Sequence, residues 1–139
     1  MTTKPSRFWE DLARDLEDPE FLREYVRESV RITTIDRLVN ELDEAREAAG
    51  LSKAELARAI SAQPSVVRRL FSSTHASPTV GTLAEVAAAL GMELTLQPLP
   101  ASERKQVTQP LLEGRSADTR ALAKHVSAMR ERRRVSLAS

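Results

Sequence analysis

Residues 48–71 read AAGLSKAELARAISAQPSVVRRLF, and this stretch decides the fold that we expect. Gly50 suits the left-handed conformation in which many helices end. Ser52 and Glu55 have the spacing of a capping box, in which each side chain satisfies an unpaired backbone donor. Pro64 favours the first position of a helix, because proline loses no hydrogen bond there. The stretch therefore predicts the end of one helix, a second helix, a tight turn and a short third helix ending near residue 71.

Apolar residues at helical spacing continue on both sides of this stretch. The additional helices are expected to begin near Ser6, Asp18, Thr34, Thr79 and Ser116. Because this periodicity covers most of the chain and only four of its 139 residues are glycine, we expect a mainly α-helical protein.

Residues 92–97, MELTLQ, alternate apolar and polar side chains. This alternation predicts a short amphipathic strand, which Pro98 would end. A lone strand needs a partner, so we expect a symmetry mate or an N-terminal segment to pair with it. Residues 98–110 after the strand are interpreted as a linker.

Composition excludes several classes of function. The chain has no cysteine and two histidines, so we expect no disulfide, no metal site and no cofactor. No nucleophile stands at a readable spacing from a base, so an enzyme is not expected. No apolar run approaches the ~20 residues that span a bilayer, and the N-terminus lacks a signal-peptide core. We therefore expect a cytoplasmic protein without membrane contact.

Charge is distributed unevenly along the chain. Residues 1–50 carry 8 basic and 13 acidic side chains, residues 51–100 carry 4 and 3, and residues 101–139 carry 9 and 4. An acidic front and a basic tail thus bracket a nearly neutral middle. The tail arginines, Arg130 and Arg132–Arg134, are compatible with a DNA-binding arm, a partner-binding tail or a solubilising end.

Residues 34–91 resemble the xenobiotic-response-element type of helix-turn-helix, which is shared with phage Cro and repressors. The matching segments are residues 48–57, 66–70, 77–79, 82–83 and 86–91. The resemblance implies a five-helix, repressor-like helix-turn-helix domain over residues 34–99, including the short C-terminal strand. Residues 1–33 would then be an N-terminal helical extension, and residues 100–139 a linker and a basic C-terminal tail or helix.

The resemblance also implies which residues contact DNA. Residues 64–71 would be the recognition helix, which fits the major groove. The expected contacts come from Ser52, Lys53, Gln63, Ser65, Arg68, Arg69, Ser72, Thr74 and His75. Arg69 is expected to read guanine by a bidentate contact, whereas Lys53 would contact a phosphate. The sequence departs from the family pattern at Ser61, where glycine is common, and at Pro64 and Phe71, where polar residues are common.

The extra N-terminal helices and the C-terminal strand together make the chain similar to HigA-type antitoxins of bacterial toxin–antitoxin modules. That resemblance implies a homodimeric repressor, which binds an inverted-repeat operator and neutralises a RelE/HigB-like ribonuclease toxin. The residues expected to contact the partner are Phe8, Trp9, Leu12, Leu16, Phe21 and Tyr25. An apolar stripe beside acidic residues would suit a basic ribonuclease.

Two alternatives stay open at this point. One is a stand-alone dimeric, phage-like transcriptional regulator. The other is a protein-interaction scaffold that does not bind DNA, which the low positive charge of residues 51–100 allows.

Overall fold

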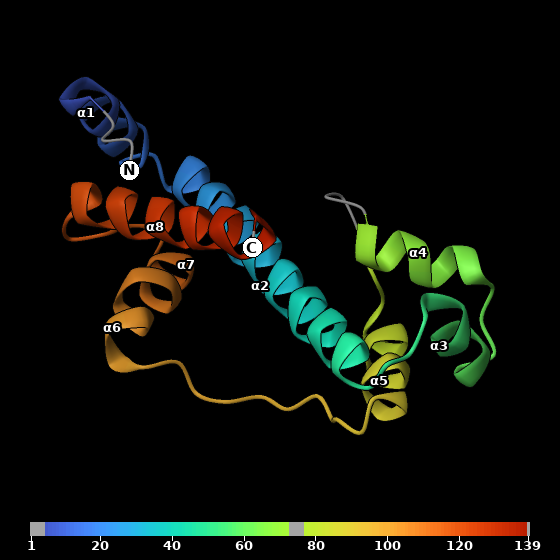
Figure 1. The fold of residues 1–139 in the computed structure, drawn as a ribbon. Helices are drawn as coiled ribbons and strands as arrows, with labels where there is room; N and C mark the ends of the chain where they lie inside the picture. The colour runs from blue at the N-terminus through green and yellow to red at the C-terminus, as the bar shows by residue number, and fades with distance from the viewer. Residues whose placement is uncertain (1–4, 73–76, 139) are drawn as a thin grey trace. The chain divides into compact units, whose positions relative to one another are not determined.

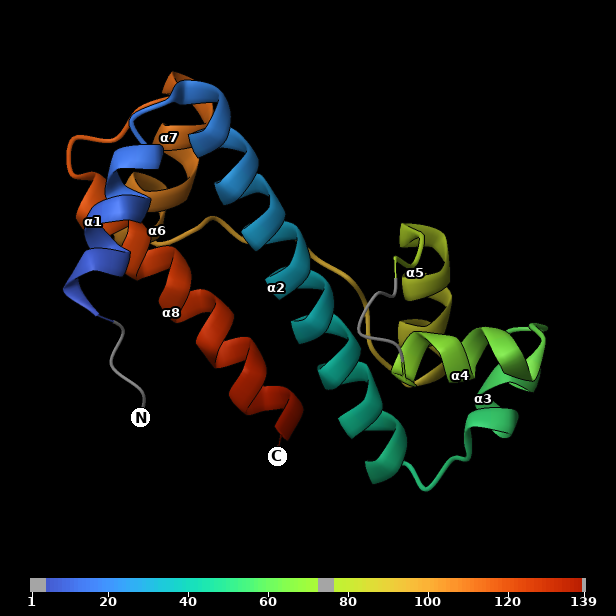
Figure 2. The same cartoon turned by 90° about the horizontal axis from the view of Figure 1, so that it is seen from above.

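The computed structural model describes residues 5–72 and 77–138, which Figures 1 and 2 draw as a ribbon. Side chains are described up to Glu131. The described residues are mainly helical and contain no strand. The helices are α1 (Ser6–Asp15), α2 (Pro19–Ala48), α3 (Lys53–Ala59), α4 (Pro64–Ser72), α5 (Val80–Ala89), α6 (Ala101–Glu103), the π-helical turn η1 (Arg104–Thr108), α7 (Gln109–Glu113) and α8 (Thr119–Ala138). None of the described helices combines the length and apolar character needed to cross a lipid bilayer.

The chain divides into two compact units. The first unit comprises residues 1–34 and 98–139, and the second unit comprises residues 35–97. Helix α2 begins in the first unit and ends in the second. Residues 98–110, interpreted from the sequence as a linker, are helical from Ala101 onward. That interpretation was wrong because Val107 packs in the core of the first unit, which stabilises helical turns that the local sequence does not indicate.

The core of the first unit lies between α1, the start of α2 and α8. Its buried side chains are Leu12, Leu16, Leu22, Val26, Val107, Leu122, Ala123 and Val126. Helix α8 runs beside the first half of α2 (Figure 2), and Arg130 on α8 donates from Nε to Ser29 Oγ on α2 at 2.8 Å. Arg23 on α2 donates to the carbonyls of Leu111 and Leu112 at the end of α7, both at 3.0 Å. These contacts join segments that lie far apart in the sequence.

Helix α2 does not stop at Thr34, where a new helix was expected to begin. The hydroxyl groups in this region donate to backbone carbonyls four residues earlier in α2, and they do not cap a new helix. Thr33 Oγ1 donates to the Ser29 carbonyl at 2.7 Å, and Ser29 Oγ donates to the Tyr25 carbonyl at 2.8 Å. Back-bonding of this kind satisfies serine and threonine inside a helix, so the expected cap at Thr34 was wrong and the helix continues to Ala48.

The second unit packs the end of α2 against α3, α4 and α5. Its buried side chains are Leu42, Leu56, Ala57, Val67, Leu70, Leu83, Val86 and Ala87. Thr79 caps α5, because its Oγ1 accepts from the Thr82 backbone N–H at 3.1 Å. The expected count of five helices is not confirmed, because the described helices of this unit are only these four.

The expected strand at residues 92–97 is also not seen; the segment forms no regular secondary structure. Leu94 packs against the core of the second unit, but Leu96 is 100% exposed. The alternation of apolar and polar side chains predicts only which side of a strand would be buried. The hydrogen bonds of a sheet need a second strand. The part of this chain that the structure describes supplies none.

Candidate nucleic-acid interface

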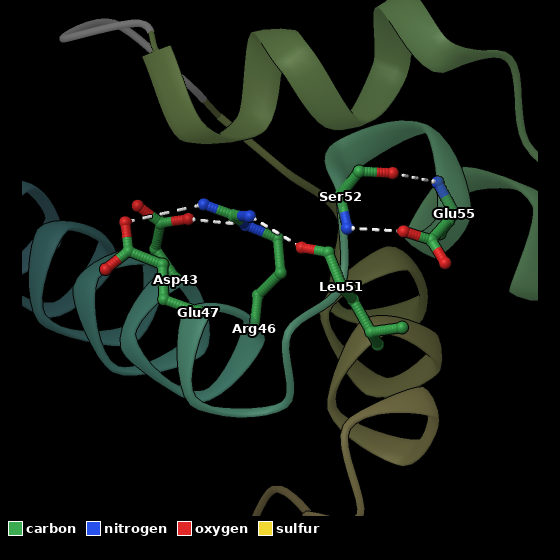
Figure 3. Close-up of polar contacts among 6 residues, drawn as sticks. All are labelled: Asp43, Arg46, Glu47, Leu51, Ser52 and Glu55. Atoms are coloured by element: carbon green, nitrogen blue, oxygen red, sulfur yellow. Dashed lines mark hydrogen bonds and ion pairs between the residues drawn. The ribbon is translucent and has the colours of Figure 1, made fainter.

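The turn between α2 and α3 is held by Arg46 (Figure 3). Gly50 takes φ 71° and so ends the helix in the left-handed conformation. Arg46 Nη1 donates to the Leu51 carbonyl at 2.7 Å, and its Nε lies 2.9 Å from Asp43 Oδ1. The Arg46 side chain is only 13% exposed. The guanidinium therefore ties the end of α2 to Leu51, two residues before α3.

The predicted capping box at the start of α3 is present (Figure 3). Ser52 Oγ accepts from the Glu55 backbone N–H at 3.0 Å, and the Ser52 backbone N–H donates to Glu55 Oε1 at 2.9 Å. The hydrogen bond from the Ser52 backbone, followed by that involving its side chain, lowers the pKa of Glu55 below 4.5. Ser52 is exposed and Lys53 is half-buried, so both side chains reach solvent at the beginning of α3.

A tight turn joins α3 to α4. Ser61 has φ 53°, which is the left-handed region where glycine is favoured. The Ala62 backbone N–H donates to the Ala57 carbonyl at 2.9 Å, which closes the end of α3. Pro64 is the first residue of α4, as its sequence position predicts. Gln63, directly before it, is exposed.

Helix α4 buries one face and exposes the other. Val67 and Leu70 are buried in the core of the second unit. Ser65, Arg68, Arg69 and Ser72 are exposed, and their spacing of three and four residues places them on one side of the helix. We call these four residues the α4 outer face. Because Val67 and Leu70 anchor α4 in the core, the helix holds the α4 outer face toward solvent.

Neither Arg68 nor Arg69 forms an ion pair with a carboxylate in the described part of the chain. The second unit as a whole carries six basic and eight acidic side chains, with histidine uncounted. Five of those acids lie on α2. Helix α4, with two basic side chains and no acidic one, thus differs from a unit that is acidic as a whole.

Sequence reasoning missed two features of this region. Arg46 was not singled out, although an arginine four residues before a helix-ending glycine is placed to bond the carbonyls that follow. Val66, which is 38% exposed on α4, was also not among the predicted contact residues. It borders a hollow of about 220 Å³ together with Arg69, Leu70, Ser77, Pro78, Thr79 and Thr82.

The predicted contact residues between Ser52 and Ser72 all belong to α3, α4 or the residues that flank them. Thr74 and His75 lie outside the described residues. No group of three or more histidine, aspartate or glutamate side chains suited to a metal ion occurs among the described residues.

The residues predicted to contact a protein partner are split between the core and the surface of the first unit. Leu12 and Leu16 are buried in that core. Phe8 is 38% exposed and packs edge-on against Trp9, with ring centroids 5.2 Å apart. Phe21 is 36% exposed and stacks on Tyr25 at 5.9 Å. These two aromatic pairs are the accessible part of the predicted set.

A family model described as helix-turn-helix matches residues 42–97. The match spans the end of α2, helices α3 to α5 and the segment after α5, and it suggests a DNA-binding regulator. Comparison with curated proteins gives no match, and comparison with solved structures gives none.

Proposed function

We propose that this chain is a sequence-specific DNA-binding transcriptional repressor that places α4 in the major groove. The α4 outer face carries this proposal, because it offers two guanidinium groups without an ion pair and the Ser65 hydroxyl on a helix whose other face is buried. The Ser72 hydroxyl donates to the Arg68 carbonyl of the same helix. An α-helix of this kind fits the major groove, where base edges can be distinguished. The helix-turn-helix match over residues 42–97 supports the same function.

The exposed side chains divide into two roles. Arg69, together with Ser65 one turn before it, faces the bases and can form a bidentate contact to guanine worth about 1–3 kcal/mol of discrimination. Arg68, Gln63 and the beginning of α3 contact the phosphate backbone on either side. Lys53, the first residue of α3, supplies the positive charge for the phosphate contact at the beginning of that helix.

The repressor acts as a homodimer on an inverted repeat. One short helix reads only a few base pairs, and a two-fold dimer doubles the contact with half-sites about one helical turn apart. The second unit has more acids than bases, so its binding to random DNA is weak and specificity rests on the dimer.

Selection from random duplexes, followed by fluorescence anisotropy at several salt concentrations, tests the proposal. Arg69→Ala should lower affinity and relax the preference at one base pair. Lys53→Ala should weaken binding to all sequences alike and reduce the salt slope by about 1. Arg120→Ala removes the same charge from an exposed position on α8 and serves as the control. Failure to enrich any sequence, with no dependence on salt, would contradict DNA binding.

A second proposed role is that of an antitoxin, as in HigA-type modules. The exposed Phe8 and Phe21 beside their aromatic partners support it, as do exposed acids nearby at Glu10, Asp15 and Glu17. Such a surface suits a basic RelE/HigB-like ribonuclease.

Co-purification with the product of the neighbouring gene tests this role. Phe21→Ala should weaken the complex, whereas Leu112→Ala, at a 75% exposed position elsewhere in the first unit, should not. DNA binding without any complex would identify a stand-alone regulator. A complex without DNA binding would identify an interaction scaffold.

A further inference from the structure

One apolar side chain of α4 lies outside the core. Val67 and Leu70 are buried in the second unit, whereas Val66 is 38% exposed. Val66 precedes Arg69 by three residues, so the two side chains are neighbours on the helix surface. An exposed valine therefore borders the α4 outer face.

Val66 forms one wall of the hollow of about 220 Å³ between α4 and the beginning of α5. Leu70 and Pro78 give this hollow two further apolar walls. Arg69 and Thr82 also line it. The hollow is therefore a mostly apolar recess next to Arg69, the residue that we propose reads guanine.

The spacing of Val66 and Arg69 is close to that of neighbouring base pairs. Three residues of an α-helix rise about 4.5 Å along its axis, and stacked base pairs are about 3.4 Å apart. When Arg69 reaches a guanine in the major groove, Val66 lies at the level of the next base pair. This placement rests on the proposed function, because it requires α4 to lie in that groove.

We propose that Val66 contacts the C5 methyl group of a thymine in the base pair next to the guanine that Arg69 reads. Thymine is the base that presents an apolar group in the major groove. The valine side chain has no hydrogen-bonding group. An amino group of cytosine or adenine placed against it would lose water without gaining a partner, which is unfavourable.

This contact extends the sequence that α4 can read. Pro64, at the start of the helix, has no side-chain donor or acceptor, so hydrogen bonds to the bases come from Ser65 and Arg69. Apolar recognition by Val66 adds a second base pair beside the guanine. The preferred sequence should therefore contain a thymine next to that guanine.

Replacement of a single methyl group of the DNA tests the contact. The probe is the duplex selected from random sequences, in which Arg69→Ala identifies the guanine as the base whose preference is relaxed. Deoxyuridine then replaces the neighbouring thymine, which removes the C5 methyl group and keeps the hydrogen-bonding groups. Fluorescence anisotropy should show about fourfold weaker binding, the effect of one buried methyl group. This ratio should be the same at each salt concentration, because no phosphate contact changes.

Variants of the chain assign the methyl contact to Val66. Val66→Ala should weaken binding to the thymine duplex and reduce the ratio between the two duplexes to less than about twofold. Val80→Ala makes the same change at a 74% exposed position of α5 that does not line the recess, and it should keep the fourfold ratio. Both variants should keep the circular dichroism spectrum, because alanine favours a helix.

Different results contradict this inference and the proposed function. Failure to enrich any sequence, with no dependence on salt, contradicts DNA binding and the Val66 contact together. A selected sequence without thymine beside that guanine, or equal binding of the thymine and deoxyuridine duplexes, overturns the Val66 contact alone. An undiminished ratio in Val66→Ala also overturns it, because another residue would then contact the methyl group.

Discussion

Replacing Arg46 by methionine should destabilise the second unit more than its position on a surface helix indicates. Arg46 donates to the Leu51 carbonyl at 2.7 Å and pairs with Asp43 at 2.9 Å. Its guanidinium carbon also lies 5.9 Å from the centroid of the Phe71 ring, near the end of α4. One side chain thus contacts α2, Leu51 in the turn before α3, and Phe71 on α4. Methionine keeps the length and apolar stem but none of these polar contacts.

The magnitude follows from the burial of each contact. A hydrogen bond from a charged donor contributes about 1.5–3 kcal/mol. The ring contact adds about 0.5–1 kcal/mol. The pair with Asp43, whose side chain is 33% exposed, adds less than about 1 kcal/mol because water screens it. Since these contributions overlap, we expect Arg46→Met to lower the free energy of unfolding by about 2–3 kcal/mol.

Urea unfolding followed by circular dichroism measures this change. Arg46→Lys keeps the charge but not the planar fork, so its loss should be intermediate, about 1 kcal/mol. Arg37→Met, at an exposed position on the same helix, should change stability by less than about 0.5 kcal/mol. If Arg46→Met cost no more than Arg37→Met, the clamp between α2, α3 and α4 would be refuted.

Three further predictions concern local conformation. Ser61→Gly should stabilise the chain by about 0.5–1 kcal/mol in urea unfolding, because φ is 53° there; a destabilised variant would count against the strained turn. Glu55 should titrate below 4.5 by NMR, so the stability from its carboxylate is present above its unfolded pKa and is lost as pH falls through its lower folded pKa. Glu55→Gln should therefore remove part of the acid sensitivity, and an unchanged acid limb would contradict this. Gly114→Ala should cost about 1–2 kcal/mol, because φ is 72° and a Cβ would meet Arg23 Cζ at 3.0 Å. The helical Gly81→Ala, with no neighbour closer than 3.8 Å, should stabilise α5 by up to about 1 kcal/mol, and equal effects at the two glycines would contradict the distinction.

Signals that act within four residues predicted local structure well. The capping box at Ser52 and Glu55 is confirmed, as are Pro64 at the start of α4 and Thr79 as the cap of α5. Each signal depends on a hydrogen bond or a φ angle inside one turn, so no distant residue is needed to satisfy it. The role of the α4 outer face in DNA binding stays a prediction.

Features that depend on distant partners could not be predicted in this way. Thr34 looked like a cap, but its surroundings continue as one helix. Residues 98–110 looked like a linker, but Val107 finds a core between α1, α2 and α8. Leu12 and Leu16 were expected at a partner surface, yet they are buried in the same core. In each case a contact across the fold, absent from the local sequence, decides the outcome.

The sequence by itself thus determined the helix-turn-helix of residues 48–71, because its cap and turn signals each depend on groups within one helical turn. Only the tertiary structure decided that Arg46 joins that motif to the end of α2 and to Phe71, and that residues 92–97 form no regular secondary structure. The physical reason is that a helix satisfies its own backbone, whereas a clamp or a strand needs groups that another part of the fold, or another chain, must supply.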